Sequence, residues 1–340
     1  KKYYRIKYIN KTESQVIIAK YYFLLYGNFV VKNALDFGVI LEKCGVGKET
    51  SQVVIKKLSE LDTDLSASEI IELYEYILGC VKDSEVLSGV IKLADAYRDK
   101  KILSKLLDIL LLKTVDNTDA DNLINTRVLC AKAIANYKDT STVGALLYCL
   151  NNKGENYKIR LACADALGRI GDKYAVESLI DVVKDEEEKS VYVKESATFA
   201  LGLLGDVSAI DPLVSIMEAK QGLLGKFSFL KERIVEALGK LNINNSKVLK
   251  VLKNALYDSS PMVRINAIEA LMNSDYEEAP ELIRTALKDE DDEVKRNALI
   301  ALYNIIGRDI LDEVISLPGY NEFLKTEARN IIEEYEEVDE

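Results

Sequence analysis

The chain has 340 residues, of which 48% are apolar and 30% charged, a composition that supports a large buried core and is not that of a disordered chain. It contains no histidine, which excludes Ser-His-Asp and Cys-His catalysis and every histidine metal site. The formal net charge is −11, and because residues 1–120 are nearly neutral, the acidic excess lies in residues 121–340. Such an acidic body repels phosphate backbones, so we expect no nucleic-acid partner.

The cysteine pattern and the lack of long apolar runs indicate a protein of a reducing compartment. Five cysteines without a CxxC pair do not form a disulfide framework, and we expect a cytoplasmic protein. No run of 18 apolar residues exists that could span a membrane. The nearest candidate, residues 16–31, is interrupted by Lys20, Gly27 and Asn28, and we interpret it as a buried helix. The chain begins at Lys1, which leaves open an anchoring segment upstream.

The first third of the chain, residues 1–121, shows helical patterns that are weaker than those that follow. Apolar residues at helical spacing predict helices within 12–43 and a helical pair within 48–80. Residues 93–110 fit one degenerate repeat of the pattern described below. We favour degenerate repeats or a cap continuous with the rest of the chain over a separate helical domain. The basic and aromatic segment 1–8 is interpreted as a capping arm, with contact to an anionic surface as the alternative.

From residue 122 onward, a basic residue recurs every 30 to 37 residues, at Arg127, Arg160, Lys194, Lys231, Arg264, Lys295 and Lys325. Six positions later stands an alanine in all but the last case: Ala133, Ala166, Ala200, Ala237, Ala270 and Ala301. Apolar residues one position before, and three and seven after, complete the buried stripe of an amphipathic helix. The alanines predict a close approach between neighbouring helices, because larger side chains would hold their backbones apart.

A second helix follows each of these first helices. Gly171 and Gly205 are expected to end the first helix in the left-handed conformation, and Asp172 and Asp206 to cap the next one. Nineteen residues after the basic position, an apolar residue marks the second helix, at Leu146, Leu179, Leu213, Ile283 and Val314. The sequence therefore predicts an all-α protein, an α-α superhelix or α-solenoid of antiparallel helix pairs over residues 122–335, with an acidic tail at 336–340.

The runs IRLACADALGRIGDKYAVESLIDVV (159–183) and VKESATFALGLLGDVSAIDPLVSIM (193–217) resemble HEAT repeats of the phycobilisome-lyase type. The resemblance covers roughly residues 122–335. The extended surface, the repeated acidic charge and the lack of a reactive constellation predict a non-catalytic, armadillo-like scaffold or adaptor that binds a protein partner on its acidic surface. Two alternatives follow from the resemblance to HEAT repeats. One is a bilin lyase-like enzyme or lyase subunit, and the other, more remote, is a HEAT-like DNA glycosylase, which the absence of tryptophan and of a basic stripe disfavours.

An acidic residue recurs on the second helices, seventeen positions after the basic residue, at Glu177, Asp211, Glu281 and Asp312. Gly144 takes the equivalent place in an earlier repeat. The position lies about 100° around the helix from the core stripe, so it is at least partly exposed. We predict that this acidic row binds a protein partner, for which a basic surface would be complementary. Ordinary solvated carboxylates are the alternative.

The segment 220–227 is the second candidate site, because it lies where the repeat spacing rises to 37. Leu223, Leu224 and Phe227 are apolar residues in a glycine-containing loop, where polar residues are the norm. We predict a docking loop, with the alternative that the segment folds back over the neighbouring repeat.

Other motifs are interpreted as structural. Four cysteines are expected to be buried small residues of helices, namely Cys80, Cys130, Cys149 and Cys163. Residues 44–50 lack the glycine and hydroxyl positions of a phosphate-binding loop and are expected to connect two helices. The acidic run 289–293 lacks the glycine turn of a calcium loop and is expected to support a helix N-terminus. Acids six residues before the basic positions, such as Asp258 and Asp289, are expected to form ion pairs that order the turns between repeats. No cofactor or metal is expected.

Overall fold

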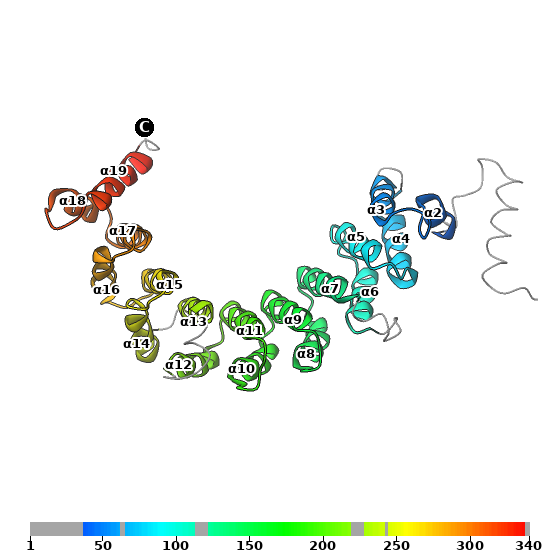
Figure 1. The fold of residues 1–340 in the computed structure, drawn as a ribbon, viewed down its shortest axis with the longest axis horizontal. Helices are drawn as coiled ribbons and strands as arrows, with labels where there is room; N and C mark the ends of the chain where they lie inside the picture. The colour runs from blue at the N-terminus through cyan, green and yellow to red at the C-terminus, as the bar shows by residue number, and fades with distance from the viewer. Residues whose placement is uncertain (1–36, 62–64, 113–121, 219–227, 242–243, 337–340) are drawn as a thin grey trace, which may run out of the picture. The chain divides into compact units, whose positions relative to one another are not determined.

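The computed structural model describes residues 37–61, 65–112, 122–218, 228–241 and 244–336, and these contain helices and no strand (Figure 1). The chain divides into two compact units, residues 1–137 and 138–340. None of the helices in the described ranges combines the length and apolar composition that a membrane span needs. The all-α fold class predicted from the sequence is confirmed.

The first unit contains six described helices: α2 (Phe37–Cys44), α3 (Ser51–Glu60), α4 (Ala67–Cys80), α5 (Ser84–Ala94), α6 (Lys100–Leu110) and α7 (Ile124–Tyr137). The helical pair expected within 48–80 is thus α3 and α4. Ser66 begins α4 with a capping box, in which its side chain and that of Glu69 each accept a hydrogen bond from the other residue's N–H. The segments expected at 1–8 and 16–31 lie outside the described residues.

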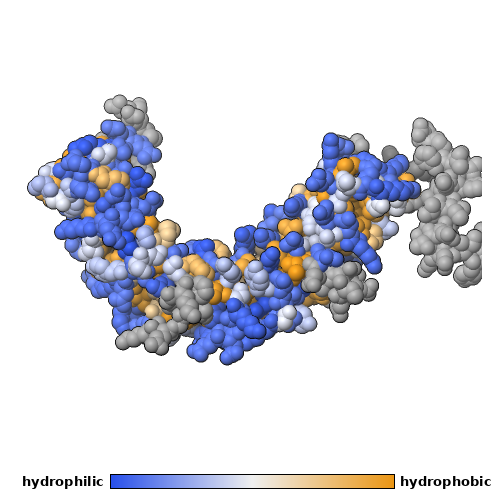
Figure 2. All heavy atoms as spheres, in the orientation of Figure 1, coloured by the Kyte–Doolittle hydropathy of each residue, from blue (hydrophilic) through white to orange (hydrophobic). Residues whose placement is uncertain are grey.

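The second unit consists of two layers of helices. The first helices of the repeats form one layer: α9 (Tyr157–Ile170), α11 (Val191–Leu204), α13 (Ser228–Lys240), α15 (Pro261–Met272) and α17 (Asp292–Ile306). The second helices form the other: α8 (Val143–Asn151), α10 (Val176–Lys184), α12 (Ile210–Glu218), α14 (Ser246–Ala255), α16 (Ala279–Thr285) and α18 (Asp309–Ser316), and α19 (Glu322–Glu336) follows. Figure 2 shows mostly hydrophilic residues over α10 and its neighbours in the second layer.

The predicted core columns are buried. No alanine of the column that runs from Ala133 to Ala301 is more than 6% exposed, and the apolar markers of the second helices are fully buried. Gly171 and Gly205 end α9 and α11 with φ of 84° and 64°, the left-handed conformation that glycine adopts without strain. The side chains of Asp172 and Asp206 then accept hydrogen bonds from the N–H two residues on, so both predicted caps form.

The close approach predicted from the alanines occurs between neighbouring first helices. For Ala200, Ala237 and Ala270, the partner is a glycine of the preceding repeat, two positions after that repeat's own alanine. A Cβ added to the glycine would lie 2.7 Å from the Cα of Ala200 at Gly168, 3.0 Å from the Cα of Ala237 at Gly202, and 2.6 Å from the Cβ of Ala270 at Gly239. These glycine–alanine pairs form a seam that brings the first helices together.

The basic column also stabilises the preceding helix. Its members lie close to helix ends whose last carbonyls have no partner within the helix. Three members donate hydrogen bonds to those carbonyls: Arg127 Nε to Leu110 O at 2.8 Å, Arg160 Nε to Leu150 O at 2.8 Å and Lys194 Nζ to Val183 O at 3.1 Å. Arg264 Nη1 donates to Asp258 O, in the turn that follows α14, at 2.8 Å. A cation at a helix C-terminus is favourable because of the helix dipole.

Three members of the basic column form ion pairs across repeats, which we call the ion-pair ladder: Arg160–Glu188 at 2.6 Å, Lys231–Asp258 at 2.7 Å and Arg264–Asp289 at 2.7 Å. Each acid also accepts a hydrogen bond from the N–H two residues after it, at 2.9 to 3.0 Å. The expected ion pairing therefore exists, but each acid binds the basic residue of the preceding repeat. Of the basic residues six positions after these acids, Arg264 belongs to the next pair of the ladder, whereas Lys194 and Lys295 do not belong to it.

Candidate functional site

All four members of the acidic row, Glu177, Asp211, Glu281 and Asp312, are exposed on second helices. Three of them have a cationic neighbour, in the pairs Asp211–Lys247 at 2.6 Å, Asp312–Arg308 at 3.5 Å and Glu281–Arg284 at 3.9 Å. Glu177 has no ion-pair partner among the described residues. The row is thus partly neutralised, and Glu177 is the member whose charge has no such neighbour.

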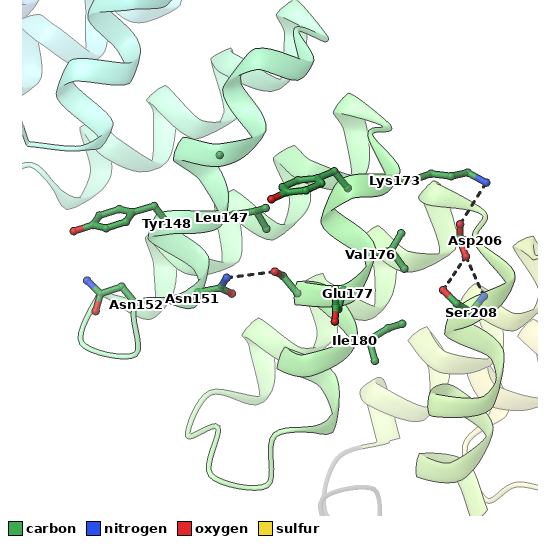
Figure 3. Close-up of a pocket in the computed structure, with 13 residues that line it drawn as sticks. Leu147, Tyr148, Asn151, Asn152, Lys173, Val176, Glu177, Ile180, Asp206 and Ser208 are labelled. Atoms are coloured by element: carbon green, nitrogen blue, oxygen red, sulfur yellow. Dashed lines mark hydrogen bonds and ion pairs between the residues drawn. The ribbon is translucent and has the colours of Figure 1, made fainter.

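Glu177 lines a groove of about 1140 Å³ formed by α8, α10 and the turn that precedes α12 (Figure 3). The α8 side contributes Tyr148 and Asn151, and the α10 side contributes Tyr174 and Glu177. In Figure 3, Tyr148 and Lys173 lie at opposite ends of the groove, with Glu177 and Ile180 between them. The groove crosses from one repeat to the next on the second-helix layer.

A glycine, Gly144, leaves space for the groove. Gly144 lines it and takes, on α8, the repeat position that Glu177 has on α10. A Cβ added to Gly144 would have no heavy atom within 4 Å. An acid or any larger residue at this position would project into the groove, so the glycine keeps this part of the groove open.

Two tyrosines expose their rings here. Tyr148 is 69% exposed and Tyr174 is 76% exposed. Tyr148 lies between the core residues Leu147 and Leu150, and helical spacing turns it away from the core. Tyr174 belongs to the short 3₁₀ turn Lys173–Ala175 that begins after the cap Asp172. Neither residue stood out in the sequence, although the helical register of α8 already predicts that Tyr148 is exposed.

The two carboxylates of the groove differ in their surroundings. Asp206 accepts hydrogen bonds from the backbone N–H and the hydroxyl of Ser208, which, with the nearby Lys173 ammonium at 3.4 Å, lower the pKa of Asp206. Glu177 lies in the first turn of α10, where the helix dipole favours a negative charge. Asp206 is therefore already satisfied within the protein, whereas the Glu177 carboxylate is available to a ligand.

The loop residues Leu223, Leu224 and Phe227 lie outside the described residues, so their role stays a prediction. The acidic run 289–293 supports a helix as expected, since the Asp291 side chain accepts hydrogen bonds from the N–H groups of Glu293 and Val294 at the start of α17. Residues 44–50 connect α2 and α3, as expected.

The cysteines offer no activated nucleophile. Cys130, Cys149 and Cys163 are buried as predicted, and burial raises the pKa of the Cys130 thiol. The prediction for Cys80 is wrong: it is exposed, because it lies at the C-terminal end of α4, beyond the stripe that the helix buries. Burial of its sulfur still raises the pKa of Cys80, which disfavours the thiolate. No group of acidic and cysteine side chains that could hold a metal ion occurs within the described ranges.

These features define the chain as an α-solenoid of antiparallel helix pairs with an open groove on its second-helix layer. The family model for HEAT repeats matches residues 115–192 and 228–304, and the model for the PBS lyase HEAT-like repeat matches residues 193–218. The chain is a HEAT-repeat protein, with a repeat of the PBS-lyase type among its repeats. No curated protein matches the sequence.

Three solved structures are similar to parts of this chain. The complex of CpcE and CpcF of phycocyanin lyase from Nostoc sp. PCC7120 is 21% identical, with 68% of this chain and 88% of that chain covered and a TM-score of 0.45. Human deoxyhypusine hydroxylase in complex with glycerol is 16% identical, with 79% and 95% covered and a TM-score of 0.32. The UNC-45 chaperone is 11% identical, with 93% and 46% covered and a TM-score of 0.47. We draw no functional conclusion from these similarities.

Proposed function

We propose that this protein is a non-catalytic scaffold that binds a protein partner at the groove between α8 and α10. The observation that carries the proposal is the combination of two exposed tyrosines and a carboxylate without an ion-pair partner in one groove. Tyrosine provides a large contact area at low cost in side-chain entropy, and it is enriched where proteins bind one another. Solenoids use such extended surfaces to hold partners.

The remaining acidic row extends this surface. Asp211 lies on α12, the next second helix, and its pair with Lys247 is exposed on both sides. Exposed ion pairs contribute little to stability, so a partner can exchange with them at small cost. A partner bound in the groove could therefore form ion pairs with these acids in place of their present pairs within the protein.

Site-specific photocrosslinking tests the proposal. A photoreactive phenylalanine analogue replaces Tyr174 in the groove or, as a matched control, Tyr257, which is equally exposed at 76% but lies at the end of α14. We expect a protein from the source lysate that crosslinks at position 174 and not at 257. Non-covalent capture of that protein by the tagged chain without the photoreactive residue should be lost in the Tyr148→Ala, Tyr174→Ala double variant and kept in Tyr257→Ala. Equal crosslinking from both positions contradicts the proposal.

The lyase-like alternative makes a different prediction. A bilin lyase or lyase subunit would bind a free bilin, and the absorbance spectrum of the bilin would shift when protein is added. If the shift occurs and is lost in the double variant, the groove binds a chromophore and the scaffold proposal is wrong for this site.

A further inference from the structure

We infer that the occupant of the groove is an extended segment of the partner that presents a lysine or arginine side chain to Glu177. This inference rests on the proposed function and names the chemistry that the groove selects. It concerns a single cationic side chain rather than a broadly basic partner surface, because the rest of the acidic row already has cationic neighbours.

The charge balance of the groove selects a cation. Of its two carboxylates, Asp206 accepts hydrogen bonds from Ser208 and pairs with Lys173. Glu177 has no ion-pair partner among the described residues. Lys173, the cation that lines the groove, is paired with Asp206 at 3.4 Å. An incoming lysine or arginine thus finds one open carboxylate, while an incoming acid finds no unpaired cation among the residues that line the groove.

The aromatic residues favour the same ligand. An ammonium or guanidinium group that lies over a tyrosine ring is attracted by its electron-rich face, and the aliphatic part of the same side chain packs on the ring. Tyr148 and Tyr174 bring such rings to the groove that contains Glu177. Arginine and lysine therefore gain both a carboxylate and an aromatic surface, which glutamine or leucine would not.

The groove also offers hydrogen bonds to a peptide backbone. Asn151 lines it, and the Asn151 amide group donates to the Ser178 hydroxyl at 3.4 Å, a long hydrogen bond that is easily exchanged. A side-chain amide supplies both a donor and an acceptor, which match the C=O and N–H groups of an extended chain. A helical segment has these groups occupied internally, so the extended conformation is favoured.

Gly144 decides whether a side chain can enter. Because a Cβ at this position meets no atom within 4 Å, a larger residue is accommodated by the fold and occupies the groove instead. Gly144→Leu is therefore a blocking variant that should leave the helices intact. It separates loss of binding from loss of folding, since its melting temperature should equal or exceed that of the wild type.

The test uses synthetic heptapeptide pools whose central residue is fixed as Lys, Arg, Gln or Glu and whose other positions are randomised without charged residues. Binding is measured by fluorescence anisotropy with the full chain. We expect the Lys and Arg pools to bind about 5-fold more tightly than the Gln pool, the ratio that about 1 kcal/mol gives for one exposed charge pair. Glu177→Gln should remove this preference, and Glu177→Lys should turn it toward the Glu pool.

Two control variants complete the experiment. Glu278→Gln alters an exposed acid that already pairs with Lys253 and lies outside the groove and the acidic row, so it should leave the preference unchanged. Gly144→Leu should abolish binding of every pool. Equal binding of all pools to the wild type, or an unchanged order in Glu177→Lys, overturns the inference. If a partner still crosslinks at position 174 in that case, the scaffold function stands and only the basic ligand is wrong. Concentration-dependent self-association that Gly144→Leu removes would also overturn it, because the occupant would then be a second copy of the chain.

Discussion

The buried ion pair between Arg160 and Glu188 gives the sharpest test of how the repeats are held together. Both side chains are almost fully buried, at 6% and 3% exposed, and their atoms approach to 2.6 Å. Glu188 also accepts a hydrogen bond from the N–H of Ser190, and Arg160 donates one to Leu150 O. Glu188→Gln keeps the shape and an acceptor for Ser190, but it leaves the guanidinium buried without its counter-ion.

The cost of this substitution follows from the burial. Removing one partner of a buried ion pair costs about 3 to 5 kcal/mol, because the remaining charge stays desolvated. Since Gln retains one hydrogen bond, we expect the lower value, about 3 kcal/mol. For a unit the size of residues 138–340, each kcal/mol lowers the melting temperature by about 2 to 4 °C, so a fall of about 6 to 12 °C is expected.

Urea denaturation followed by far-UV circular dichroism measures the change, with Glu177→Gln as the control. Glu177 is exposed, so its amide variant should stay within about 0.5 kcal/mol of the wild type. Because repeat arrays can unfold in parts, hydrogen exchange of the Ser190 amide should be followed as well, and it should accelerate in Glu188→Gln. If Glu188→Gln is as stable as Glu177→Gln, the ladder does not stabilise the repeats and the reasoning is wrong.

Three further predictions concern acid stability, the seam and the helix ends. Burial raises the pKa of Glu188, but the hydrogen bonds from Arg160 and Ser190 outweigh it and hold this pKa below its ordinary value of 4.5. The difference in unfolding free energy between wild type and Glu188→Gln should therefore be constant above pH 4.5 and shrink as the pH falls through the lower pKa of the folded state. A difference that does not change with pH in acid titrations contradicts this. Gly168→Ala should destabilise the protein by about 1 kcal/mol, because the added Cβ meets the Ala200 backbone at 2.7 Å. Gly144→Ala, whose added Cβ lies in open space, should stabilise it by up to about 1 kcal/mol. Thermal melts that rank the two variants in the opposite order contradict the close glycine–alanine packing of the seam. Gly171→Ala should lower the free energy of unfolding by about 1 kcal/mol, because an alanine at a φ of 84° is strained. The same melts measure this change, and an unchanged stability would show that the turn adopts another conformation.

The sequence predicted the features that follow from spacing within a repeat. The position of the alanine column, the glycine–aspartate turns at Gly171 and Gly205, and the exposure of Glu177 all depend on helical geometry alone. The residue that each alanine contacts could not be predicted in the same way. Ala200, for example, meets Gly168, which belongs to the preceding repeat. Contacts between repeats depend on how far neighbouring helices are displaced along their axes, and no residue spacing gives that displacement.

The same limit explains the ion pairs and the groove. Asp258 lies six residues from Arg264 in the sequence, yet its side chain binds Lys231, which precedes it by 27 residues. The groove arises from Gly144 on one repeat and Glu177 on the next, so each residue looks unremarkable within its own repeat. The prediction that Cys80 is buried was wrong for a different reason. An apolar run in the sequence does not show at which residue of the last helical turn burial ends.

The ion-pair ladder has a consequence for where the chain tolerates changes in length. Each pair joins residues 25 to 28 apart, so an insertion between them would move the carboxylate away from its cation, which is buried in the pairs of Arg160 and Arg264. Between Lys194 and Lys231, the position six residues before the next basic residue is Gly225, and this is also the interval in which the repeat spacing reaches 37. The same position is Gly154 before Arg160 and Gly319 before Lys325, so the longest interval is one of three in which no carboxylate has to reach back to the preceding basic residue. Loops grafted into that interval should be tolerated, whereas loops of the same length placed between Arg160 and Glu188 should not.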